Sequence, residues 1–258
     1  MANLLEQYGI KEVADVTIYE IHEDGSTSPV LFLDTLKVST IEQTAEQTEA
    51  RGGKGNPPLI IWDYGKEITV TLEDALFSPA SMAIMFGDDD GLSAVSSVTR
   101  MVKKALTAAD IASLPTGSTK WYTGATEGKG MVAITTTTGL KAGQIVYEES
   151  TVSTSVGTKI EITAEKFPGT YKLVGETFAR NRKTGKDEYF QFVIPQAKMS
   201  SENTITLEAE GDPSVFNMTM RVLRPDSGAM MELIQYSLPD SGAAAASYSA
   251  PANKGGLA

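Results

Sequence analysis

The side chains of this 258-residue chain that could do chemistry are few, and their spacing completes no catalytic motif. There is no cysteine and a single histidine, His22, which excludes a thiolate metal site, a Cys/His catalytic pair and an HExxH zinc site. The run Asp88–Gly91 resembles the start of a calcium loop, but Thr99 stands where that loop needs a glutamate. The segment Gly124–Gly130 resembles a phosphate loop that is one residue short. We therefore expect no enzymatic activity, no cofactor and no bound metal.

The net charge limits the classes of partner. The chain has 33 acidic and 22 basic residues, giving a net charge of −11. A protein that reads nucleic-acid sequence normally carries a basic surface, so the charge argues against that class. No segment approaches 18 consecutive apolar residues, and the first residues lack the basic and apolar regions of a signal peptide. We expect synthesis in the cytoplasm and no association with a membrane.

The most informative stretch runs from Thr35 to Gly87 and predicts a long β-hairpin. It opens as a strand with Leu36 and Val38 on one face, and then continues without an apolar side. The even face carries Glu42, Thr44, Glu46 and Thr48, and the odd face carries Gln43, Ala45, Gln47 and Glu49. After a glycine-rich tip the chain returns through a second strand, so each arm has roughly a dozen residues, about 40 Å. An isolated two-stranded ribbon is marginal in water, so we expect other copies of the protein to order it.

The rest of the chain predicts a mainly β fold, a sandwich or partly closed barrel with one short packed helix. Ser78 as N-cap, Pro79 at the first position and Gly87 after the end predict a helix over Pro79–Phe86. Strands are predicted at Val16–His22, Val30–Asp34, Ile160–Ala164, Tyr171–Phe178, Tyr189–Ile194, Ile205–Ala209 and Phe216–Val222.

The predicted domain organisation is one domain with a tail. Residues 1–238 form the domain, and residues 92–157, rich in threonine and glycine, form an insertion or a less regular region. Residues 239–258 are rich in alanine, glycine, serine and proline, and we expect a flexible tail there.

Three blocks of this sequence resemble the major tail (tail-tube) proteins of long-tailed bacteriophages. The first block contains EQTEARGGKGN at 46–56, WDYGKE at 62–67 and TLEDALFSPA at 71–80. The second contains GTYKLVGE at 169–176 and QFVIP at 191–195, and the third contains EAEGDP at 208–213 and FNMTM at 216–220. The resemblance covers the first third and most of the last third of the chain, and leaves out 91–157.

The resemblance implies a structural subunit of the virion tail. Six copies would form a ring, the hairpins would close into a barrel around a channel, and stacked rings would contact other tail proteins. DNA would pass without specific binding, and acidic and amide side chains suit such a wall because they bind no phosphate. The channel or inner-barrel candidates are Glu42, Gln43, Glu46, Gln47 and Glu49. The candidates for contacts between rings are Arg51, Gly52, Gly53, Lys54, Gly55 and Asn56 at the hairpin tip.

The face on which Glu42, Glu46 and Glu49 lie depends on whether the outgoing strand of the hairpin is regular. If Leu36 and Val38 point toward the body, a regular strand aims Glu42 and Glu46 the same way, and Gln43, Gln47 and Glu49 into the channel. A β-bulge would reverse this facing.

Two alternatives remain open at this point. One is another tail component with the same fold. The other is a β-sandwich binding module on the virion or cell surface, which binds a host or a carbohydrate through exposed aromatic side chains. Its candidates are Trp62, Tyr64, Trp121 and Tyr122.

Overall fold

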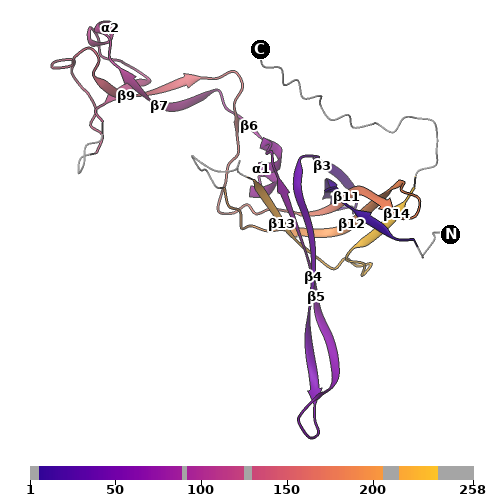
Figure 1. Cartoon of the computed structure of the whole chain (residues 1–258). Helices are drawn as coiled ribbons and strands as arrows, with labels where there is room; N and C mark the ends of the chain where they lie inside the picture. The colour runs from indigo at the N-terminus through magenta and orange to yellow at the C-terminus, as the bar shows by residue number, and fades with distance from the viewer. Residues whose placement is uncertain (1–5, 89–91, 125–129, 206–214, 238–258) are drawn as a thin grey trace, which may run out of the picture. The chain divides into compact units, whose positions relative to one another are not determined.

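The computed structural model describes residues 6–88, 92–124, 130–205 and 215–237 (Figure 1). It divides into two compact units, one formed by Met1–Asp89 with Ala164–Ala258 and the other by Asp90–Thr163. The predicted tail 239–258, residues 206–209 of the predicted strand at Ile205–Ala209, and most of the calcium-like and phosphate-like loops lie outside the described residues.

The first unit is built on one nine-stranded antiparallel sheet, with strands in the order β3-β2-β11-β12-β13-β5-β4. In addition, β1 pairs with β11 and β14 pairs with β12. The strands are β1 (Tyr8–Ile10), β2 (Asp15–Ile21), β3 (Thr27–Leu33), β4 (Leu36–Arg51), β5 (Pro58–Asp74), β11 (Thr170–Asn181), β12 (Asp187–Met199), β13 (Phe216–Val222) and β14 (Glu232–Tyr236). Strands β3 and β4 are the ends of this order, so the sheet does not close into a barrel.

One face of this sheet forms the core of the unit. Alternation along the strands puts every second residue on that face, as in Ile68, Val70 and Leu72 of β5. The buried cluster joins residues from both ends of the sheet: Val16, Ile18, Leu33, Leu36, Ile68, Val70, Leu72, Met85, Tyr171, Leu173, Phe192, Ile194, Met199, Met218, Met220 and Val222 are among its members. The sheet therefore folds over its own apolar face as a sandwich, which confirms the predicted mainly β fold class.

The packed helix α1 (Pro79–Phe86) begins and ends where the sequence predicted. The Ser78 side chain accepts a hydrogen bond from the backbone N–H of Ser81, and the Ser81 hydroxyl accepts one from the backbone N–H of Ser78. Gly87 ends the helix at φ 75°, and a Cβ there would lie 2.4 Å from the backbone carbon of Phe167. Glycine is therefore required twice at this position, by the left-handed backbone and by the close packing.

The second unit has its own small sheet and core. Its strands are β6 (Ser93–Ala94), β7 (Ser97–Ala105), β8 (Thr119–Tyr122), β9 (Ile145–Ser153) and β10 (Thr158–Lys159), and its helix is α2 (Ala108–Ile111). The sheet order is β7-β9-β8, and β10 pairs with β6. Leu106, Trp121 and Val146 form the buried cluster. The strand predicted at Ile160–Ala164 is wrong: the chain leaves β10 before it, and Ile162 is 65% exposed with no neighbouring strand to cover it.

None of the helices among the described residues is long and apolar enough to cross a membrane.

Candidate functional site on the long hairpin

Strands β4 and β5 form the long hairpin that the sequence predicted. Their 16 and 17 residues make it longer than the expected dozen, at about 55 Å. Figure 1 shows the two strands extending as a ribbon from the other strands of the first unit. From Glu42 to Glu49 on β4, and from Pro58 to Glu67 on β5, every residue is exposed. These two stretches therefore gain no burial from the described residues of their own unit.

A β-bulge at the base of β4 reverses the facing expected from a regular strand. Leu36 pairs with Asp74 and Val38 with Glu73, so Lys37 is an extra residue. Leu36 is 6% exposed and Val38 is 41% exposed, so the expectation that they share a face is wrong. Beyond the bulge, Ile41 pairs with Val70 and packs against the core.

The odd-numbered residues of β4 therefore lie on the core side of the ribbon. Gln43 pairs with buried Ile68, which places Gln43, Gln47 and Glu49 on this side. Glu42 pairs with Thr69 on the opposite face, and Glu46 follows it there. A regular strand would have put Glu42 and Glu46 on the core side and Gln43, Gln47 and Glu49 on the opposite face. Because of the bulge, each set lies on the other face.

A second bulge divides the return strand into two parts. Thr44 pairs with Glu67 and Glu46 with Tyr64, so β5 carries one extra residue between these pairs, and Gly65 adopts φ 60° there. Before the bulge, Trp62 pairs with Thr48. Trp62 and Tyr64 therefore share the face of Glu46, opposite to the buried face of the same strand. Their even numbering alone would have put them on the face of Ile68, Val70 and Leu72.

The outer part of β5 exposes large apolar side chains on both faces. Ile60, Trp62 and Tyr64 lie on the face of Glu46, while Ile61 pairs with Glu49 on the other. The five exposed residues, between 50% and 65% accessible, are Leu59, Ile60, Ile61, Trp62 and Tyr64. Contiguous exposed apolar surface of this kind marks a site of protein association. The outgoing strand β4 carries no large apolar residue after Ile41, so the two strands of the outer ribbon differ sharply in chemistry.

The inner part of the hairpin has a continuous polar face. It is formed by Thr40, Glu42, Thr44, Glu67, Thr69 and Thr71, continued on β13 by Thr219 and Arg221. Arg221 forms a salt bridge with Glu67 across the strands. On the core side of the outer ribbon, Gln47 donates from Nε2 to Oδ1 of Asp63 at 2.8 Å.

The tip is a closed turn of small residues. The Gly52 N–H donates to the carbonyl oxygen of Pro57 at 3.3 Å, and the Asn56 N–H to that of Gly53 at 3.1 Å. Arg51 ends β4 and forms an ion pair with Glu49 at 2.6 Å, while exposed Lys54 stands between Gly53 and Gly55, both at positive φ. The tip therefore presents backbone groups and the Lys54 ammonium, which forms no ion pair with any residue that the structure describes, and this low bulk suits insertion against another protein surface.

Other parts of the described chain offer little for catalysis or ligand binding. No group of three or more His, Cys, Asp or Glu residues within the described ranges could hold a metal ion. Asp88 of the calcium-like run forms an ion pair with Lys166 at 3.2 Å. Trp121 is 3% exposed in the core of the second unit, so it is not available to line a binding groove. The binding-module alternative therefore loses one of its four predicted aromatic contacts.

Comparison with known proteins gives one family. A family model described as the YomU/Tube protein family matches residues 8–235. The match includes 91–157, which the sequence resemblance left out. No individual curated protein matches the chain.

Proposed function

Because the chain belongs to the YomU/Tube protein family, a family of phage tail-tube proteins, we propose that six copies form a ring and that rings stack into the tube. The protein is a structural component of the phage tail, and its partners are further copies of itself and other tail proteins. The observation that carries the ring model is the hairpin, whose exposed outer part has no partner in its own unit.

Free strand edges support association through the hairpin. Strand β4 is an end of the sheet order, so its outer edge has no strand beside it among the described residues. Strand β13 covers β5 only from Thr69 to Asp74, so in the described part of the chain the far edge of the outer β5 is unpaired as well. Unpaired edges are templates for another chain, and closure into a ring removes them. We propose that β4 of one copy pairs with the hairpin of the next.

The inner and outer parts of the hairpin have different roles in this proposal. The inner polar face, with Glu42 and its threonine neighbours, lines the channel. The outer part, with Trp62 and Tyr64, is covered by the adjacent ring, because large apolar side chains on both faces of a ribbon need protein rather than water around them. The tip from Arg51 to Asn56 makes the contacts between rings.

A carboxylate wall lets DNA pass without holding it. Cationic side chains that neutralise phosphates release counterions and so add affinity, whereas Glu42 on the inner polar face offers no such gain. The channel surface in this proposal therefore repels the phosphate backbone, in keeping with the net charge of −11.

The first experiment asks whether the protein forms tubes. Sedimentation and negative-stain microscopy of the purified full chain should show rings or tubes with a central channel. A protein that stays monomeric at all concentrations up to the millimolar range would contradict the tail-tube subunit model.

The second experiment asks which face lines the channel. Tubes of the Glu42→Lys variant should retain DNA, with binding lost as salt rises. The matched control is Glu49→Lys, whose side chain lies on the core side of the ribbon and should leave DNA retention at the wild-type level. Equal retention by both variants would contradict the assignment of faces.

A further inference from the structure

The turn between β11 and β12 concentrates positive charge in an acidic protein. Four cations lie within seven residues, at Arg180, Arg182, Lys183 and Lys186. Arg180 is neutralised by Asp187, to which it donates from Nε and Nη2 at 2.6 and 2.7 Å. Two further carboxylates, those of Glu6 and Glu188, accept hydrogen bonds from Asn181 in this turn, so four cations meet three carboxylates and the turn stays net positive. Lys183 and Lys186 form no ion pair within the described residues.

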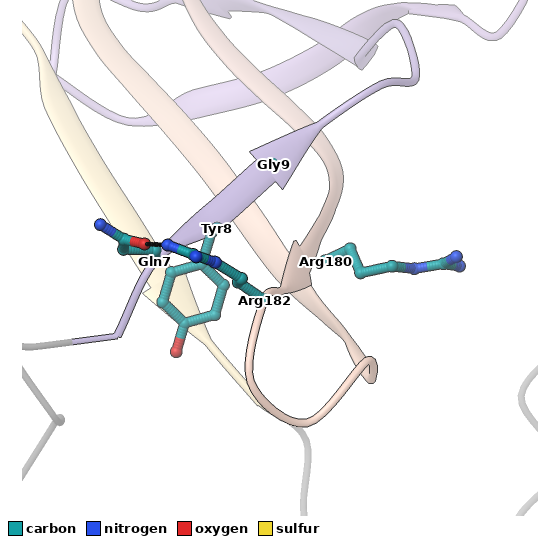
Figure 2. A pocket seen from close by; sticks show the side chains of 5 residues that line it. All are labelled: Gln7, Tyr8, Gly9, Arg180 and Arg182. Atoms are coloured by element: carbon teal, nitrogen blue, oxygen red, sulfur yellow. Dashed lines mark hydrogen bonds between the residues drawn. The ribbon is translucent and has the colours of Figure 1, made fainter.

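This turn is ordered by its own hydrogen bonds. Asn181, 1% exposed, donates to Oε2 of Glu6 at 2.6 Å, and its Oδ1 accepts from the backbone N–H groups of Lys183 and Thr184. The Arg182 N–H donates to the Gln7 carbonyl oxygen at 2.8 Å, and its guanidinium to the Gln7 side chain. Figure 2 shows this Arg182–Gln7 contact, with the Arg180 side chain extending away from Arg182 and Gln7. The residues drawn there line an open hollow of about 710 Å³. A turn built in this way loses little entropy on docking.

The turn between β2 and β3 carries the opposite charge. Glu20, Glu23 and Asp24 are exposed there, and none of the three forms an ion pair within the described ranges. Oδ1 of Asp24 accepts from the N–H and the hydroxyl of Ser26 at 2.8 and 2.6 Å, which holds the pKa of Asp24 below its usual value. The acidic turn therefore keeps its charge and its shape.

The two turns lie at opposite ends of the same strand pair. Strand β2 pairs with β11 in an antiparallel register that sets Glu20 beside Tyr171, whereas the basic turn follows Asn181. Ten residues of extended strand separate Tyr171 from Asn181, about 34 Å. That is several times the Debye length of about 8 Å at physiological ionic strength. The two charged ends cannot neutralise each other within one copy, but each matches the other end of a second copy.

We propose that the β11–β12 turn of one copy docks on the β2–β3 turn of a neighbouring copy in the tube. The contact is heterologous, with different surfaces on the two subunits, and such contacts generate closed rings or extended filaments. Its charges steer neighbouring copies into one orientation and disfavour the reverse one, because like charges would then meet. This inference rests on the proposed tube assembly.

Reversing the charges of the two turns tests the contact, because the residues whose hydrogen bonds form each turn are left unchanged. One variant carries Lys183→Glu and Lys186→Glu and keeps Arg182 on Gln7. A second carries Glu20→Lys and Glu23→Lys and keeps Asp24 on Ser26. Each should raise the protein concentration needed for assembly about tenfold, and the four-substitution combination should return it toward the wild-type value. The control, Lys103→Glu with Lys120→Glu in the second unit, should have no such effect.

Thermal unfolding of each variant separates a lost contact from a lost fold. The proposal is overturned if both folded double variants assemble at the wild-type concentration. It is also overturned if the folded combination stays as impaired as the doubles, because the turns then meet other partners. Failure of the wild-type chain to assemble would instead contradict the tube model on which the proposal rests.

Discussion

The two halves of the long hairpin are made by the same two strands and yet depend on different neighbours. In the inner half, β5 alternates strictly, with Ile68, Val70 and Leu72 buried and threonines between them. In the outer half, the same strand exposes apolar side chains on both faces, with Gly65 as the boundary.

This difference indicates which contacts stabilise each half of the hairpin. Burial in the sandwich core stabilises the inner half within one chain, because the removal of apolar surface from water drives folding. The outer half has no core to join, so the same contribution must come from other subunits. Substitutions should therefore act on folding in one half and on assembly in the other.

The largest expected effect is on the inner half. Leu72→Ala should lower the free energy of unfolding by about 2–5 kcal/mol, because it removes a fully buried side chain and leaves a cavity. Chemical denaturation of the monomer measures this. Thr71→Ala, on the opposite polar face of the same strand, should cost less than about 1 kcal/mol. Equal losses for the two variants would remove the distinction between the faces.

Trp62→Ala should weaken tube assembly while leaving the stability of the monomer nearly unchanged. Trp62 is half exposed on the outer ribbon, so the monomer should unfold within about 0.5 kcal/mol of wild type. A buried tryptophan at an interface is commonly worth 2 kcal/mol or more, so the concentration required for tube formation should rise about thirtyfold. Sedimentation of a dilution series measures it. Unchanged assembly would show that the outer half is not an interface.

Gly65→Ala should have a smaller effect, again on assembly. The added Cβ meets nothing closer than 3.8 Å, but at φ 60° an alanine backbone is strained by about 1 kcal/mol. The monomer can release this strain by fraying the outer ribbon, whereas the tube cannot. The assembly concentration should therefore rise about fivefold, while Gly130→Ala in the second unit, at ordinary φ and with open space around the added Cβ, should leave it unchanged.

Sequence patterns were sufficient for much of the fold because local physics fixed it. Ser78, Pro79 and Gly87 marked both ends of α1, and alternation marked β2, β3, β11, β12 and β13. The long hairpin was recognised from its alternating residues and glycine-rich tip. The short strands β1 and β14 were not predicted from the sequence. Three to five residues carry too little alternation to be recognised, and such strands depend on the neighbouring strand for their order.

The facing of the candidate site residues could not be obtained in the same way. The extra residue at Lys37 has no distinctive side chain, so nothing in the sequence marked the bulge that exchanged Glu42 and Gln43 between faces. A signal did exist at Gly65, since a glycine inside a strand often marks a bulge. That signal would have separated Trp62 from the buried even-numbered residues after it.

Hydrogen exchange of the hairpin tests the central claim most directly, with amides of Glu46–Glu49 and Ile60–Tyr64 compared between monomer and tube. Fast exchange in the monomer and at least a hundredfold slower exchange in the tube are expected, because neighbouring copies order the ribbon. Amides of Ile68–Leu72 should be protected in both states and serve as the internal control. Strong and equal protection of the outer ribbon in the monomer would contradict the account.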